Sequence, residues 1–175
     1  GFINILKKMN ANIKIKNLKK EAGEPIGNLI IKSSSLKSIK CPEALVPSTI
    51  DEFPLLFIVA SLVKGVSKFN GIGELRHKES DRIKSIEIGL NQIGIKTRST
   101  MSSLTIFGNP NIKINKTLTI SPEKDHRIAM AFFCLGQLLN GKVRINNFQT
   151  VNTSFKKFLF TMKKIGANFE IKKQN

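Results

Sequence analysis

A short pattern occurs three times along this chain: an amphipathic helix, a small or polar break, and an alternating strand. The copies span residues 3–15, 85–97 and 157–171. The first and last copies are close in sequence, since residues 7–12 parallel residues 163–168, and residues 91–96 are a middle version. Repetition of one supersecondary unit predicts a fold built by duplication.

A second unit alternates with the first. Residues 55–72 and 128–148 each predict a nearly all-apolar helix, a turn at Gly65 or Gly141, and then a strand. Further strands are predicted over residues 28–33, 104–108 and 118–120. The repeated order helix, strand, strand, helix, strand predicts an α/β domain of duplicated units, with buried helices inside a ring of sheets.

The pattern has no strand before its first helix, because Gly1 leads directly into it and no initiator Met precedes it. We therefore expect the repeat array to continue upstream, and the chain to be the C-terminal part of a longer protein.

Composition fits one globular domain, since 175 residues with 41% hydrophobic content can form a sizeable core. The sequence contains no run of about eighteen apolar residues, so no membrane span is expected. Cys41 and Cys134 are far apart and are interpreted as reduced and structural, which predicts a cytoplasmic protein. With His77 and His126 as the only histidines, no cluster has the spacing of a metal site.

The formal net charge of +17 raises the hypothesis of a nucleic-acid-binding module. The lysines, however, are scattered through every segment, and the chain has no Trp or Tyr to stack on bases. We therefore expect no nucleic-acid partner, while attraction of small anionic substrates remains compatible with the charge.

The densest run of ionisable side chains spans residues 74–82, at the head of a predicted helix. Behind it, Ile83, Ile86, Leu90 and Ile93 recur at helical spacing and define a buried face, which Glu79 and Arg82 are expected to extend. Buried charges are costly unless they are paired or bound to something charged. A structural ion pair is one interpretation of this pattern, and a binding site is the other.

Two other predicted helices also begin with charged residues. Asp51 precedes an apolar helix over residues 54–63, and Asp125 precedes another over residues 128–139, so both are predicted N-caps. Arg127 is unexpected there, because a cation in the first turn opposes the helix dipole. An anion bound at that terminus would resolve the conflict.

Together the three helix heads offer the cations Lys78, Arg82 and Arg127 and the carboxylates Asp51 and Glu79. This set suits proton transfer beside a bound phosphate or carboxylate. Since the chain has no nucleophile elbow and no phosphate-cradling glycine loop, the combination indicates general acid/base chemistry on small anionic molecules.

The motifs that carry these residues resemble those of the 5-enolpyruvylshikimate-3-phosphate synthase family. The three similar segments are residues 50–54, 75–82 and 125–130, in the family's order and spacing, and residues 153–155 resemble its last motif. The similarity extends from Gly1 to about Ile171. Two positions depart from the pattern, since Thr153 and Glu74 stand where some members have lysine and asparagine.

The resemblance implies transfer of the enolpyruvyl group of phosphoenolpyruvate to the 5-hydroxyl of shikimate 3-phosphate, with release of phosphate. This reaction belongs to the shikimate pathway of aromatic amino-acid biosynthesis and needs no metal or organic cofactor. The family's fold has two domains, each made of three βαβαββ units, with the active site between them. The resemblance thus implies that residues 1–175 are most of the C-terminal domain, that the N-terminal domain is absent, and that the complete enzyme is a monomer.

The same resemblance implies a role for each motif residue. Asp51 would bind the shikimate hydroxyls and accept the proton of the 5-hydroxyl, and Lys78 would contact shikimate 3-phosphate. Glu79 would move protons at the methylene carbon of phosphoenolpyruvate. Arg82 and Arg127 would hold the phosphate and carboxylate of that substrate. Asp125 and His126 would shape the site around Arg127. Without the N-terminal substrate-binding groups, we expect no turnover by this chain alone.

The nearest competing hypothesis is the sister enzyme that transfers enolpyruvyl to UDP-N-acetylglucosamine. That enzyme uses a reactive loop cysteine, and neither Cys41 nor Cys134 has an electropositive loop setting in the sequence. Two further hypotheses are a basic nucleic-acid-binding module and a protein in which every motif is purely structural.

Overall fold

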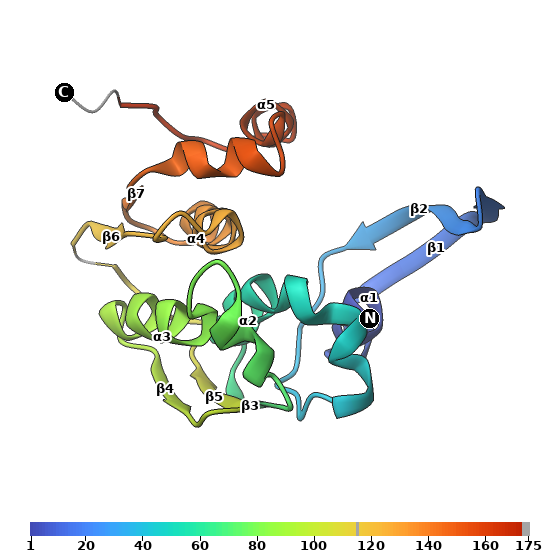
Figure 1. Ribbon diagram of the computed structural model, residues 1–175, viewed down its shortest axis with the longest axis horizontal. Helices are drawn as coiled ribbons and strands as arrows, with labels where there is room; N and C mark the ends of the chain where they lie inside the picture. The colour runs from blue at the N-terminus through green and yellow to red at the C-terminus, as the bar shows by residue number, and fades with distance from the viewer. Residues whose placement is uncertain (115, 173–175) are drawn as a thin grey trace.

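The computed structural model describes residues 1–114 and 116–172 (Figure 1). In these residues the α-helices are α1 (Phe2–Lys8), α2 (Phe53–Ser61), α3 (Arg82–Gln92), α4 (His126–Leu138) and α5 (Phe158–Lys164). The strands are β1 (Asn12–Glu21), β2 (Glu24–Lys32), β3 (Gly65–Asn70), β4 (Lys96–Ser99), β5 (Ser103–Gly108), β6 (Leu118–Ile120) and β7 (Val143–Ile145). Short 3-10 helices are η1 (Glu43–Leu45), η2 (Pro47–Glu52), η3 (Gly73–His77) and η4 (Phe148–Thr153).

The strands form three small sheets. β1 and β2 make an antiparallel ribbon that projects from the body, β3, β5 and β4 make an antiparallel sheet, and β6 pairs in parallel with β7 (Figure 1). A parallel bridge joins Lys40 to Lys68 of β3. The segment at Lys40 followed by α2, β3, α3, β4 and β5 therefore forms one βαβαββ unit.

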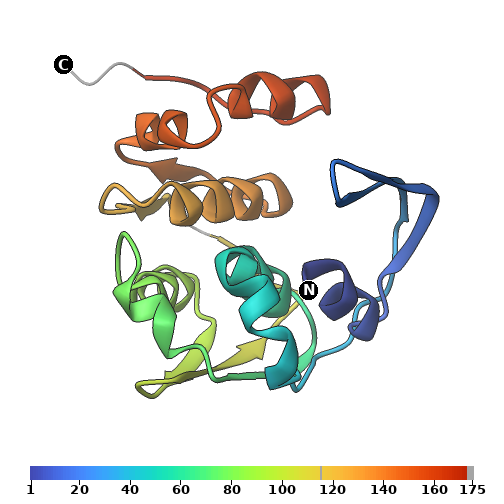
Figure 2. The same ribbon diagram turned by 45° about the vertical axis from the view of Figure 1, so that its right-hand side comes forward.

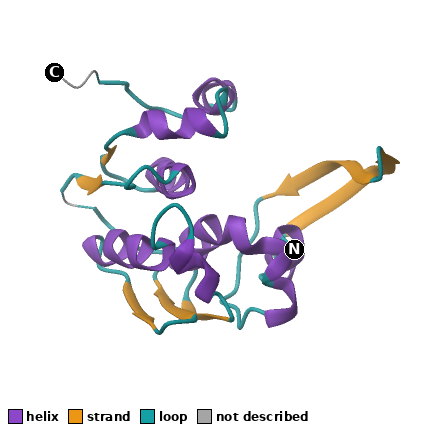
Figure 3. Cartoon of the chain, in the orientation of Figure 1, coloured by secondary structure: helices purple, strands orange, loops and turns teal. Residues whose placement is uncertain are grey.

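The neighbouring segments repeat parts of that unit. β6, α4, β7 and α5 repeat its first four elements, and the parallel β6–β7 pair corresponds to the bridge at Lys40. α1, β1 and β2 repeat its last three elements. The duplication predicted from the sequence is thus present. α2, α3 and α4 lie in the middle of the molecule, with the β3–β5–β4 sheet below them and β6 and β7 at the left, and α5 lies at the upper edge (Figure 3).

The predicted strand at the end of the third copy is wrong, since residues 167–171 adopt no strand. The side-chain amide of Gln137 binds this segment instead, accepting from the Asn168 amide at 2.9 Å and donating to the Asn168 carbonyl at 3.2 Å. Phe169 packs on Phe133, with ring centroids 5.5 Å apart. The alternation of apolar and polar residues was not enough to make this segment a strand, because it has no neighbouring strand to pair with among the described residues.

The core has two parts, one on each side of α4. Figure 2 shows α4 (orange) between the layer of α2 and α3 below it and the layer of η4 and α5 above it. Phe132 faces the main core, which is shared with α2, α3 and the β3–β5–β4 sheet and includes the contacting rings of Phe53, Phe57 and Phe69. Phe133 faces a smaller core with Val151 and Phe158. An all-apolar helix between two cores explains why no polar face is visible in its sequence.

Among the described residues no helix is both long and apolar enough to cross a membrane.

Candidate active site

The first turns of α3 and α4 meet the end of η2, which runs directly into α2, and Arg82 lies where these termini converge. Its side chain is only 1% exposed. The Nε donates to Asp125 Oδ2 at 2.9 Å, Nη1 donates to Asp51 Oδ1 at 3.2 Å, and Nη2 donates to Glu79 Oε2 at 2.5 Å. Three carboxylates therefore surround one buried guanidinium, which offsets the cost of its desolvation.

Asp125 is the fully buried partner of Arg82. Its Oδ1 accepts from the backbone amides of Arg127 at 2.9 Å and Ile128 at 3.3 Å, as the predicted N-cap of α4 should. Its Oδ2 accepts from Arg82 and from Ser80 Oγ at 3.0 Å. With four donors this carboxylate is fully satisfied, and it fixes the start of α4 against the start of α3.

Asp51 is the carboxylate that faces outward, with a side chain that is 42% exposed. Besides Arg82 it lies 3.5 Å from Arg127 Nη2 and 3.7 Å from Lys78 Nζ. Arg127 also donates to the Asp51 carbonyl at 2.9 Å and contacts Glu52 Oε1 at 3.4 Å. These carboxylates compensate the positive side chain in the first turn of α4, where the sequence predicted a bound anion.

The segment just before α3 carries Lys78 and Glu79. Lys78 Nζ lies 2.5 Å from Glu74 Oε1, in addition to its contact with Asp51. Glu79 is 47% exposed and contacts Arg82. Both side chains therefore reach the same cluster from the solvent side.

The charges of the cluster shift two pKa values. Partial burial alone would raise the pKa of Asp51, but the charge of Arg127, the hydrogen bond from Arg82 and the charge of Lys78 outweigh it and lower the pKa below its ordinary value. The hydrogen bond to Glu74, opposed by some desolvation and assisted by the charge of Asp51, raises the pKa of Lys78. Both groups are thus held in their charged forms.

Two expectations from the sequence need correction. Glu79 does not extend the buried face of α3, because the helix begins at Arg82 and Glu79 is exposed in the loop before it. Asp51 does not cap α2, because η2 continues into α2 and the carboxylate points to Arg82 and Arg127 instead. The bound anion suggested beside Arg127 stays a prediction, and in the structure Asp51 and Glu52 contact this side chain.

The structure also shows where the other predicted residues lie. Ile83, Ile86 and Leu90 are fully buried, as their spacing predicted, whereas Ile93, the fourth residue of that predicted face, is the C-cap of α3 and only half-buried. The structure brings together the residues predicted from three distant motifs: Asp51, Lys78, Glu79, Arg82, Asp125 and Arg127. His126 is partly buried at the start of α4, and in the described part of the chain its imidazole makes no hydrogen bond or ion pair.

The sequence reasoning missed several contributors. Ser80 binds Asp125, 45 positions away in sequence, so no local pattern could reveal it. Glu52 and Glu74 supply further carboxylates to Arg127 and Lys78. Asp81, by contrast, caps α3 by accepting from the Lys84 amide at 2.9 Å, and its place directly before the first helical residue was a readable signal.

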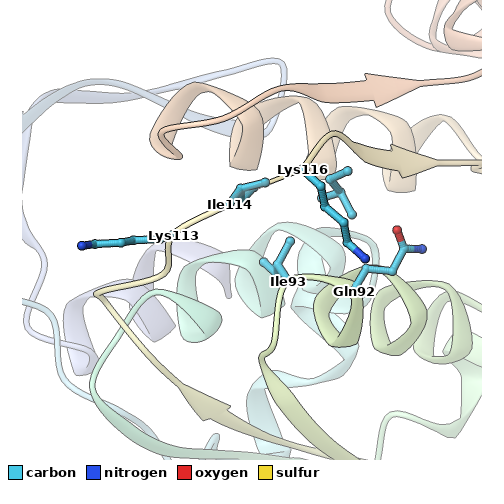
Figure 4. A pocket seen from close by; sticks show the side chains of 6 residues that line it. Gln92, Ile93, Lys113, Ile114 and Lys116 are labelled. Atoms are coloured by element: carbon cyan, nitrogen blue, oxygen red, sulfur yellow. The ribbon is translucent and has the colours of Figure 1, made fainter.

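A hollow of about 250 Å³ lies elsewhere, at the C-terminal end of α3 (Figure 4). It is lined by Gln92, Ile93, Lys113, Ile114, Lys116 and Leu118. Since Arg82 is at the opposite end of the same helix, this hollow is separate from the charged cluster.

Comparison with known proteins connects this geometry to a family. The family model described as EPSP synthase (3-phosphoshikimate 1-carboxyvinyltransferase) matches residues 1–162. The 3-phosphoshikimate 1-carboxyvinyltransferase of Clostridium tetani is 40% identical over 154 residues, covering 88% of this chain and 35% of that protein. The one of Zymomonas mobilis is 39% identical over 174 residues, covering 98% of this chain and 38% of that protein. The chain therefore spans well under half the length of these relatives.

Solved structures agree with the family match. An EPSP synthase from Acinetobacter baumannii superposes with a TM-score of 0.90 at 38% identity, covering 98% of this chain and 40% of that chain. The enolpyruvyl transferase NikO from Streptomyces tendae superposes with a TM-score of 0.61 at 14% identity, covering 95% and 35%, and so supports the fold alone. The enolpyruvyl-transferase fold predicted from the sequence is confirmed.

Proposed function

Because the chain belongs to the EPSP synthase (3-phosphoshikimate 1-carboxyvinyltransferase) family, we propose that it is most of the C-terminal domain of a two-domain enolpyruvyl transferase. The complete monomeric enzyme transfers enolpyruvyl from phosphoenolpyruvate to the 5-hydroxyl of shikimate 3-phosphate and releases phosphate. It works without metal or organic cofactor. The two cysteines of this chain are free, which fits a reducing compartment such as the cytoplasm.

The observation that carries this proposal is the convergence of three cations and several carboxylates at the starts of α2, α3 and α4. Arg82, Arg127 and Lys78 provide positive charge for two anionic substrates, while Asp51 and Glu79 are exposed enough to reach a reacting atom. Preorganised charge of this kind stabilises a transition state in which negative charge moves onto a leaving phosphate.

Arg82 is only 1% exposed, and each of its three guanidinium nitrogens already donates to a carboxylate, so an anion reaches it by displacing one or more of these partners. Asp125 is buried and remains its fixed partner, whereas Asp51 and Glu79 lie on the open side. We infer that phosphoenolpyruvate replaces them at Nη1 and Nη2. The two displaced carboxylates are then left beside the substrate.

This exchange gives Asp51 and Glu79 their chemical roles. While Arg82, Arg127 and Lys78 face Asp51, its lowered pKa makes it a weak base. Once substrate anions engage those cations, the pKa rises and Asp51 can take the proton of the attacking 5-hydroxyl. Protonated Glu79 gives a proton to the methylene carbon as the hydroxyl oxygen adds to the neighbouring carbon. It takes a proton back from the resulting methyl group as the C–O bond to phosphate breaks, and the hydroxyl proton held by Asp51 leaves with the phosphate.

The test is phosphate release by the full-length gene product, measured with both substrates and with each omitted. Glu79→Gln and Asp51→Asn should each lower kcat on the order of 100-fold or more, as loss of a general acid or base does. Glu24→Gln, on the exposed ribbon, is the matched control and should leave kcat unchanged. Release that does not require shikimate 3-phosphate, or that survives Glu79→Gln, would refute the proposal.

Salt-dependent binding to duplex or single-stranded nucleic acid provides a counter-test. Two results together would favour a nucleic-acid-binding module over an enzyme. The affinity for nucleic acid would fall steeply with salt, and Arg82→Ala would weaken that affinity no more than substitution of a distant lysine does.

A further inference from the structure

Arg76 lies beside the charged cluster, and its guanidinium is engaged with a different part of the chain. Nη1 donates to Asp81 Oδ2 at 2.7 Å, and Nη2 donates to the Thr100 carbonyl at 2.6 Å. Nη2 also reaches Ser99 Oγ at 3.2 Å, and Nε donates to the Met101 carbonyl at 3.2 Å. Because the side chain is only 15% exposed and meets four acceptors from two segments, it acts as a rigid clamp.

The Arg76–Asp81 bridge closes the two ends of the short loop 77–80. Asp81 is itself fixed as the N-cap of α3. The enclosed loop carries Lys78, Glu79 and Ser80, whose side chains contact Asp51, Arg82 and Asp125, respectively. Arg76 therefore holds both ends of the segment that supplies these groups to the cluster.

The same guanidinium attaches this loop to the turn between β4 and β5. The Ile72 amide donates to the Ser102 carbonyl at 3.0 Å, and Ser99 Oγ donates to Glu87 Oε2 of α3 at 2.6 Å. At Gly73 a Cβ would lie 3.3 Å from the Met101 carbonyl oxygen, so the two segments are closely apposed. Hydrogen bonds thus connect loop 77–80, the β4–β5 turn and α3, and Arg76 donates both to Asp81 at the start of α3 and to the turn.

We propose that Arg76 is a positioning residue for enolpyruvyl transfer, holding loop 77–80 so that Lys78 and Glu79 face Asp51 and Arg82. In the described contacts its guanidinium touches none of Asp51, Glu79 or Asp125, so it acts through the loop. This inference rests on the proposed function. Misplacement of a catalytic group by about 1 Å costs on the order of 100-fold in rate, so a loosened loop should be costly.

The kinetic test uses the full-length gene product with Arg76→Gln and Arg76→Lys. Arg76→Gln should lower kcat on the order of 100-fold through Glu79. It should raise the KM for shikimate 3-phosphate about tenfold, the effect of losing one charge-assisted contact from Lys78. The KM for phosphoenolpyruvate should change less, because Arg127 lies on α4. Arg76→Lys, which keeps one charged contact, should lie between wild type and Arg76→Gln.

Arg144→Gln is the control, since Arg144 is exposed on β7, and it should match wild type. If Arg76 only stabilised the fold, its loss would lower the active fraction, and kcat would fall with both KM values unchanged. That pattern, or equality of Arg76→Gln with Arg144→Gln, would overturn the proposal.

A second measurement needs no substrate and separates this inference from the proposed function. In the 175-residue chain, NMR order parameters of backbone amides 77–80 and 99–102 should fall in Arg76→Gln while those of α2 stay constant. If wild-type full-length protein releases no phosphate, the proposed function fails, and unchanged loop order would overturn the positioning role independently. Should Arg76→Gln not fold, Arg76→Lys carries the same comparison.

Discussion

At residue scale, Asp125 is the carboxylate on which the charged cluster depends. It is fully buried, pairs with an Arg82 side chain that is 1% exposed, and also caps α4. Removing one member of a buried ion pair leaves the other charge uncompensated, whereas an exposed pair contributes little. The cluster therefore has a fixed inner partner in Asp125 and exchangeable outer partners in Asp51 and Glu79.

The first prediction follows from this asymmetry. Asp125→Asn keeps the shape and a capping oxygen but removes the charge, so it should lower the free energy of unfolding by about 3–5 kcal/mol. Asp51→Asn should cost about 1 kcal/mol or less, because that carboxylate is partly solvated. Urea denaturation of the 175-residue chain measures both. Equal losses would show that Arg82 depends on the two carboxylates alike.

A second prediction concerns pH. Because the folded pKa of Asp51 lies below its ordinary 3.8, the folded state binds fewer protons than the unfolded state in that range. Its stabilising contribution is complete above the unfolded pKa and is lost as pH falls through the folded pKa. Urea midpoints measured from about pH 6 down to pH 3 should therefore fall less steeply in Asp51→Asn than in wild type. The exposed-ribbon variant Glu24→Gln is the comparison, and an identical slope in the two variants would contradict the assignment.

At the scale of elements, α3 and α4 cross at a glycine. A Cβ built on Gly89 would overlap the Phe132 ring and lie 3.0 Å from Ile120 Cδ1. Phe132 is fully buried in the main core, so its ring has little room to move away. The missing side chain at this position is thus what allows the two helices to approach, and with them Arg82 and Asp125.

The third prediction concerns whether Gly89→Ala raises or lowers the free energy of unfolding. At an exposed helix position Gly→Ala stabilises by up to about 1 kcal/mol, but Gly89→Ala should destabilise by about 1–3 kcal/mol through overpacking. Thermal or urea unfolding of the 175-residue chain measures the change. Adding Phe132→Leu should make the two losses less than additive, because the smaller side chain relieves the clash. A stabilising Gly89→Ala would show that close contact with Phe132 does not limit the side chain at this position.

Elements were predictable from sequence where one periodic face decides burial. The spacing of Ile83, Ile86 and Leu90 predicted the buried face of α3, and the alternating segments before and after it gave β3, β4 and β5. Two predictions failed because tertiary partners decide them. Residues 167–171 have no adjacent strand among the described residues, and Asp51 turns from a helix terminus to Arg82 and Arg127.

In the candidate site, too, some features follow from the local sequence and others from tertiary contacts. The three local motifs identified the charged residues of the site. They did not show which of these charges is buried. Glu79 and Arg82 lie three positions apart, yet one is exposed and the other buried, because the helix begins only at Arg82. Contacts such as Ser80 with Asp125 join segments that only the fold brings together.

At the scale of the whole molecule, α4 is shared by two cores of unequal size. The main core joins α2, α3 and the antiparallel sheet. The smaller core lies between α4, which contributes Ala129 and Phe133, and the layer of η4 and α5, which contributes Val151 and Phe158. Figure 2 shows this layer above α4. A layer with few buried residues opens at lower free energy than the body on which it packs. We therefore expect η4 and α5 to form a separate, weaker cooperative unit.

Two adjacent phenylalanines of α4 test this last prediction, since they face opposite cores. Phe133→Ala should increase hydrogen exchange in residues 148–164 and leave α2 and α3 protected, because it removes the central ring of the smaller core. Phe132→Ala should lower the global free energy of unfolding by about 3–5 kcal/mol and accelerate exchange throughout. Hydrogen exchange followed by mass spectrometry resolves the segments. If Phe133→Ala also exposed α2 and α3, the two cores would unfold as one, and the charged cluster would lose its order whenever the C-terminal layer opened.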